Sequence, residues 1–132
     1  MAWIHLVTIL ALFQFLLFGA LVGRARVKYK VQAPATTGNE MFERYYRVQM
    51  NTLELLAAFL PALWIATTYW DPRWMAAVGA VYLLGRMLYL RAYTTEPRSR
   101  GLAYMLSLLP VMVLMAAGLA GVMLSTMRGA PG

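Results

Sequence analysis

The chain has 132 residues, of which 61% are hydrophobic and 13% are charged. This composition is too apolar for a soluble domain of this length and predicts one integral membrane domain. With no cysteine and one histidine, His5, the chain lacks the material for a disulfide, a thiolate or histidine metal site, a cysteine nucleophile or a His-dependent triad. Any chemistry must come from Arg, Tyr, Glu, Asn, Gln and Ser side chains, and we expect no metal.

The formal net charge of +7 raises the question of nucleic acid binding, but the charge distribution favours a membrane. Most of the Lys and Arg residues lie in two short hydrophilic connections between apolar segments, which is the positive-inside pattern. We therefore expect membrane lipids, and no nucleic acid, among the partners.

The first apolar segment, residues 3–23, is about 31 Å long at ~1.5 Å per residue, enough to span a bilayer. The competing interpretation is a signal peptide, but no positive region precedes the segment. We expect a retained transmembrane helix, followed by a basic connection over residues 24–39.

The second predicted helix covers residues 40–69. Asn39 is its predicted N-cap, and Glu40 and Glu43 lie in the first turn, where the helix dipole favours acidic side chains. A tight turn over residues 70–74 leads to a third helix, residues 74–94. A second basic loop, residues 95–101, leads to a fourth helix, residues 102–127. The prediction is an all-α, up-and-down bundle of four transmembrane helices that forms a single domain over residues 1–132.

Charge predicts the orientation of this bundle. Only Arg73 and Arg128 lie near the face opposite the two basic loops, so we place the loops in the cytoplasm and both termini outside. All four tryptophans lie toward the outer side, as an interfacial belt would. In a bacterium the membrane would be the inner one.

Two polar stripes cross the predicted helices. Arg44, Arg47, Asn51 and Glu54 share one face of the second helix, at i, i+3, i+7 and i+10. The third helix carries Tyr82, Arg86, Tyr89 and Tyr93 at i, i+4, i+7 and i+11. Ionisable groups at membrane depth are costly and mark functional sites, and we expect Arg86 to form a buried pair with Glu54.

Guanidinium groups suit the recognition of carboxylates, so the arginines near this face favour a site for a small anion. The alternative is a set of inter-helix salt bridges, but five arginines against one buried acid make that account incomplete. Gln49 lies about 160° around the helix from Arg47, so it cannot join the same pocket within one subunit, but it could line a neighbour's pocket if sites form between subunits. The five arginines of this predicted anion site are Arg44, Arg47, Arg86, Arg98 and Arg100.

Three segments carry a family resemblance: FERYYRVQMNTLE, then FLPALWIA, then VYLLGRMLYLRAY. They resemble the membrane-associated proteins in eicosanoid and glutathione metabolism (MAPEG), and the similarity runs from about Arg24 to Tyr104. The pattern E-R-x-x-R-x-x-x-N-x-x-E, from Glu43 to Glu54, is its most specific part. The resemblance is closest in kind to the microsomal glutathione transferases.

The resemblance implies a homotrimer that binds glutathione, as co-substrate, between subunits near the cytoplasmic face. Arg100 corresponds to the arginine that stabilises the thiolate, and the second substrate would be a lipophilic molecule from the bilayer. The implied glutathione-binding residues are Arg26, Arg47, Gln49, Asn51, Glu54, Arg86, Tyr89, Tyr93 and Tyr104.

The chain departs from the specialised synthases of that family at Val27, Leu55 and Gly101. These departures argue for a broad glutathione transferase or peroxidase acting on lipophilic electrophiles or hydroperoxides, in detoxification. Two alternatives remain open: a non-catalytic lipid-binding scaffold resembling the lipoxygenase-activating protein, and a small transporter or channel subunit. Because the chain has no thiol of its own, a thiol nucleophile must arrive with a substrate.

Overall fold

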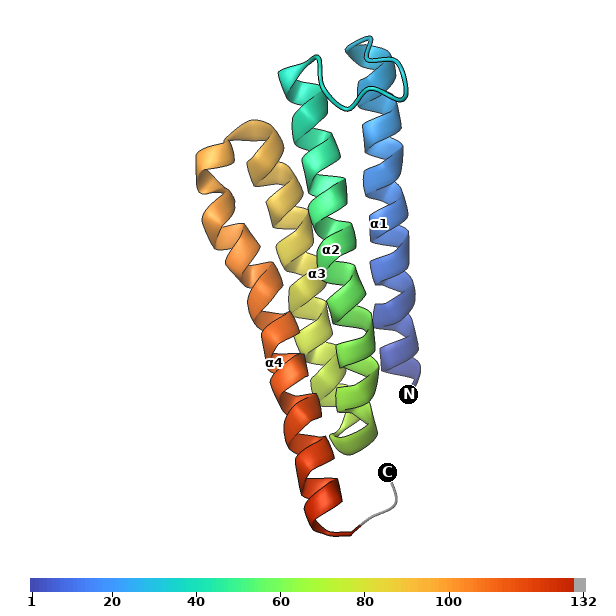
Figure 1. Ribbon diagram of the computed structural model, residues 1–132, viewed down its shortest axis with the longest axis vertical. Coiled ribbons are helices and arrows are strands. Elements are labelled where there is room, and N and C mark those ends of the chain that lie inside the picture. The colour runs from blue at the N-terminus through green and yellow to red at the C-terminus, as the bar shows by residue number, and fades with distance from the viewer. Residues whose placement is uncertain (130–132) are drawn as a thin grey trace.

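The protein is a bundle of four long helices that run up and down beside one another (Figure 1). The computed structural model describes residues 1–129. Each of the four long helices is long and apolar enough to cross a membrane, as expected for an integral membrane protein. The helices are α1 (Ala2–Lys28), α2 (Glu40–Tyr69), α3 (Pro72–Thr95) and α4 (Arg100–Met127), with a short 3₁₀ turn, η1 (Pro97–Ser99), before α4.

The two ends of the bundle differ in composition. The α1–α2 and α3–α4 connections lie together at one end, and both chain termini lie toward the other (Figure 1). We call the first the basic end, because it carries the two basic connections, and the second the tryptophan end, because it carries Trp3, Trp70 and Trp74.

Local chemistry sets where the helices begin and end. The predicted N-cap of α2 is confirmed: the Asn39 side chain accepts a hydrogen bond from the Phe42 amide at 3.0 Å. Asp71 caps α3 by accepting from the Arg73 amide at 2.9 Å. A side-chain hydrogen bond from Arg73 also holds the pKa of the Asp71 carboxyl below its ordinary value.

Three helices extend further than the sequence pattern predicted. α1 runs through Lys28, beyond the predicted end at Gly23, since Arg and Lys are good helix formers and cations are stabilised at a helix C-terminus. α3 begins at Pro72, where proline suits the first helical turn. α4 begins at Arg100 and continues directly from the 3₁₀ turn.

The core is built mainly on α2 and α3. α1 packs on both of these helices but not on α4 within the described chain, so α1 and α4 flank the bundle on separate sides. The larger buried cluster, around Phe59, Leu63 and Tyr82, fills the half nearer the tryptophan end. A smaller one, around Phe18, Val48 and Tyr89, lies nearer the basic end. Many large apolar side chains are exposed on the outside of the single chain, as expected for helices that face lipid.

At Gly85 the backbones of α3 and α4 approach each other closely. A Cβ at Gly85 would lie 2.7 Å from the Leu106 carbonyl carbon and 2.8 Å from the Ser107 nitrogen. Backbone atoms of a packed helix cannot move aside as a flexible side chain can.

We therefore expect Gly85→Ala to destabilise the fold by about 1–3 kcal/mol, because α3 and α4 must separate. Gly23→Ala is the matched control, since nothing lies within 4 Å of its added Cβ. Thermal unfolding in detergent measures both variants. Equal melting temperatures for the two would contradict a close α3–α4 contact at Gly85.

Candidate functional site

Arg86 is the centre of the polar interior. Its side chain is fully buried, and its Nε donates to the Ser107 hydroxyl of α4 at 2.9 Å. Its Nη1 donates to the Asn51 amide oxygen at 2.8 Å and to the Thr52 hydroxyl at 3.1 Å, both on α2. One guanidinium thereby links α2, α3 and α4. Its Nη2 is buried without a hydrogen-bond partner in the described residues.

The predicted buried pair between Arg86 and Glu54 is wrong. Glu54 is exposed and forms no ion pair with any of residues 1–129. The neutral oxygens of Asn51, Thr52 and Ser107 accept from the Arg86 Nε and Nη1 instead, because Glu54 lies almost a full turn beyond Asn51 and is exposed. Sequence reasoning missed Thr52 and Ser107. For Ser107 the available signal was a lone hydroxyl in an otherwise apolar stretch of helix, whereas Thr52 lies beside Asn51 in the polar half of α2 and gave no separate signal.

A continuous set of rings connects Arg86 to the basic end. The Arg86 guanidinium lies 4.3 Å from the centre of the Tyr89 ring. Tyr89 in turn lies 5.5 Å from Tyr93 and 6.0 Å from Tyr104, measured between ring centroids. The Arg100 guanidinium lies 5.4 Å from the Tyr93 ring. We call Asn51, Arg86, Tyr89, Tyr93, Arg100 and Tyr104 the arginine–tyrosine cluster.

Arg47 and Glu54 border this cluster on α2. Both side chains are exposed, one turn to either side of Asn51 along the helix. Arg47 lies near enough to interact electrostatically with the Tyr89 hydroxyl, as do Arg86 and Arg100. Three guanidinium groups therefore make the electrostatic potential near Tyr89 positive, and the carboxylate of Glu54 lies at the edge of this region.

Arg26 and Gln49 lie apart from the cluster, on the side of α1. The Arg26 Nη1 donates to the Ala35 carbonyl at 2.7 Å, and its guanidinium lies 4.7 Å from the Phe42 ring. This contact holds the α1–α2 connection. The Gln49 Nε2 lies 2.7 Å from where a Cβ on Gly19 of α1 would be. A single chain thus brings together most of the predicted site residues, but not these two.

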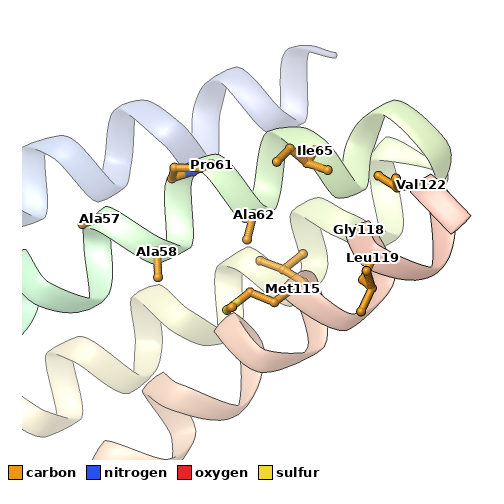
Figure 2. Close-up of a pocket in the computed structure, with 10 residues that line it drawn as sticks. Ala57, Ala58, Pro61, Ala62, Ile65, Met115, Gly118, Leu119 and Val122 are labelled. Carbon is orange, nitrogen blue, oxygen red and sulfur yellow. The ribbon is translucent and has the colours of Figure 1, made fainter. Parts of the chain in front are cut away.

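An apolar hollow of about 350 Å³ lies between α2 and α4, nearer the tryptophan end (Figure 2). Its lining includes Ala58, Pro61 and Met115, and it has no charged side chain. Met115 lies about 22 Å from Arg100 along α4, at ~1.5 Å per residue. The hollow is therefore separate from the arginine–tyrosine cluster. Residues 1–129 also hold no group of three or more His, Asp or Glu side chains placed to bind a metal ion.

Four membrane-spanning helices with a buried arginine shared among three of them define a small integral membrane protein with a cationic site near one end. A family model described as the MAPEG family matches residues 4–120, and the chain belongs to this family. The resemblance noted in the sequence is confirmed.

Individual relatives extend the comparison. An uncharacterized protein of Synechocystis sp. is 48% identical over 121 residues, covering 92% of this chain and 88% of its own. Human microsomal glutathione S-transferase 2 is 38% identical over 116 residues, covering 88% and 79%. Leukotriene C4 synthase of Cavia porcellus is 38% identical over 94 residues, covering 71% and 63%. The match to each runs over most of this chain.

The Arg86 network predicts an unequal effect of two serine substitutions on α4. Ser107→Ala removes the acceptor of the Arg86 Nε–H and leaves a buried charged donor unsatisfied, at a cost of about 1–3 kcal/mol. Ser125→Ala, near the other end of the same helix, touches no such group and should change the stability by less than about 0.5 kcal/mol. Thermal unfolding in detergent compares them, and equal stability losses would show that the Ser107 contact contributes little.

Proposed function

We propose that the protein is a glutathione-dependent membrane transferase that activates the glutathione thiol for attack on lipophilic electrophiles, with peroxidase activity toward hydroperoxides. Relatives named as a glutathione S-transferase and as leukotriene C4 synthase support this proposal. The observation that carries it is the placement of Arg100 on Tyr93, joined through Tyr89 to the buried Arg86.

The charges around the cluster complement those of glutathione. The tripeptide has carboxylates at both ends and an amine at one of them. Arg47 is exposed and suited to hold a carboxylate, and Glu54 is placed to accept from the amine. Asn51 is already fixed by Arg86 through its amide oxygen, so its NH₂ group is oriented to donate. Tyr93 and Tyr104 offer hydroxyl groups beside them.

Arg100 is the residue that we assign to thiol activation. A free thiol has a pKa of about 8.5, and a neighbouring guanidinium lowers it by stabilising the thiolate. Arg100 is also the first residue of α4, where the helix dipole adds positive potential. The thiolate sulfur then bonds to the electrophilic carbon as the leaving group departs. With a hydroperoxide the thiolate attacks the terminal oxygen, and the O–O bond breaks to give a glutathione sulfenic acid and an alkoxide that is protonated to the alcohol. A second glutathione thiol then attacks the sulfenic sulfur, which forms the disulfide and releases water.

The lipophilic substrate would approach from the bilayer. The apolar surface of α4 begins within two turns of Arg100, where Leu102 is 74% exposed and Met105 is 43% exposed. A molecule dissolved in lipid reaches such a surface by lateral diffusion, with its reactive group near the thiolate and its apolar part in the membrane.

We further propose that the active form is a homotrimer with a site between subunits. Arg26 and Gln49, on the α1 side of the bundle, lie away from the cluster of their own chain. Packing that α1 side of one subunit against the α2–α4 side of the next would add both residues to a neighbour's site. With the basic end in the cytoplasm and both termini outside, in a bacterial inner membrane or a eukaryotic endomembrane, glutathione would enter from the cytosol.

The thiolate assignment predicts a specific loss in Arg100→Ala. With glutathione and chlorodinitrobenzene, this variant should lose at least about tenfold in turnover at neutral pH, and its rate should rise at higher pH than that of the wild type. Both follow from a higher pKa of the bound thiol. The measurements are the pH–rate profile and the thiolate absorbance. Arg98→Ala, an exposed cation two residues away, is the control and should match the wild type.

The same assay separates the alternative functions. A wild type with neither thiolate absorbance nor conjugation would contradict the enzyme and favour the lipid-binding scaffold. Flux of ions or solutes through liposomes that contain the protein would favour a transporter or channel subunit.

Arg47→Ala should affect glutathione binding rather than folding. Because Arg47 is exposed, its removal should leave the melting temperature unchanged and raise the KM for glutathione by about tenfold, the loss of one charge-assisted contact. Arg44→Ala is the control on the same helix, since Arg44 pairs with Glu40 at 2.6 Å instead. An equal rise in KM for both variants would mean that the general positive field, and not Arg47, attracts the substrate.

A further inference from the structure

We propose that the flank of α1 that carries Arg24 and Lys28 is a binding site for an anionic phospholipid. At the basic end, a hollow of about 110 Å³ is lined by Arg24, Lys28, Tyr29 and Tyr45, with Leu21 and Ala25 as its apolar floor. The hollow combines two cationic side chains and two tyrosines, and cationic groups bind the phosphate diester of a lipid.

The register of α1 makes this hollow distinct from the proposed glutathione site. Leu21, Arg24, Ala25 and Lys28 fall at i, i+3, i+4 and i+7 and form one stripe. Arg26 lies about 200° around the helix from Arg24, at ~100° per residue. The lipid site and the Arg26 side of α1 therefore face different directions.

No carboxylate lines the hollow, and the two acids in the first turn of α2, the helix that supplies Tyr45, are already engaged. Glu40 pairs with Arg44 at 2.6 Å, and Glu43 accepts from the Gly38 amide at 3.2 Å. The C-terminal end of α1 contributes roughly half a negative charge, but the N-terminal end of α2 beside it contributes roughly half a positive charge. The partial charges at the two helix ends offset each other, so Arg24 and Lys28 determine the electrostatic potential in the hollow.

The same stripe continues into the membrane as an apolar groove. A hollow of about 430 Å³ between α1 and α3 is lined by Leu10, Leu17, Leu84 and their neighbours. Leu17 lies about 10 Å below Arg24, at ~1.5 Å per residue. Gln14 donates to the Leu83 carbonyl at 2.9 Å and fixes α1 against α3 along this groove.

The two hollows match the two parts of one lipid. The two cations of the polar hollow, Arg24 and Lys28, follow the last residue of the apolar segment, Gly23, and so lie at the level of the headgroups. The groove beneath it lies within the hydrocarbon. A phospholipid with a net negative headgroup would place its phosphate between Arg24 and Lys28 and an acyl chain along Leu17. A zwitterionic lipid would add a cation that these residues repel.

The test compares phosphatidylglycerol with phosphatidylcholine of identical chains, by native mass spectrometry of the protein in an uncharged detergent without glutathione. Arg24→Gln combined with Lys28→Gln should weaken phosphatidylglycerol binding by at least about tenfold, since two charge-assisted contacts are lost. Lys30→Gln combined with Arg98→Gln removes as many exposed cations from the same end, outside the hollow, and should bind like the wild type.

A second pair of variants tests the groove. Leu17→Trp fills it and should weaken phosphatidylglycerol binding, whereas Leu16→Trp, on another face and 65% exposed, should not. Glycerol 3-phosphate distinguishes a lipid site from a free phosphate site, and it should bind far more weakly than the lipid. Equal binding of the two lipids, equal loss in the two charge variants, or tight binding of glycerol 3-phosphate would each overturn the proposal. None of these readouts depends on the proposed enzymatic activity.

Discussion

The buried guanidinium of Arg86 is the interaction on which the rest of the structure depends. A charged group without hydrogen-bond partners would be costly at this depth, yet Asn51, Thr52 and Ser107 satisfy most of its donors. The requirement for these oxygens fixes the register of α2 and α4 against α3. Gly85, one residue earlier on α3, lets α4 come close enough for Ser107 to reach.

The same network connects folding to function. Neutral oxygens solvate Arg86 without cancelling its charge, so the positive potential remains available to the rings and to the space beside them. Contacts among Tyr89, Tyr93 and Tyr104 then connect Arg86 with Arg100, at the start of α4. A thiolate at that point would meet a guanidinium and a helix N-terminus together, which is the physical basis of the proposed transferase.

The position of α1 has consequences on both of its flanks. Because it packs on α2 and α3 but not on α4, one flank carries Arg26, with Gln49 of α2 on the same side, and the other carries the basic hollow above an apolar groove. In the proposed trimer, the first flank would complete a neighbour's glutathione site. In the proposed lipid site, the second flank would hold an annular lipid. The two proposals thus give the peripheral helix α1 roles in assembly and lipid binding, while α2, α3 and α4 carry the arginine–tyrosine cluster.

The sequence by itself determined the four membrane helices, the N-cap at Asn39 and the stripe from Arg86 to Tyr93, because hydrophobic length, capping and helical period are local properties. Family membership likewise followed from motif spacing. Only the tertiary structure decided the partners of Arg86. Periodicity places Asn51 and Glu54 on one face, but the rotation of α2 against α3 turns Asn51 inward and leaves Glu54 exposed. The role of Thr52 and Ser107 as partners of Arg86 was visible only in the structure for the same reason. Which hydroxyl contacts a buried charge depends on how helices distant in sequence pack together.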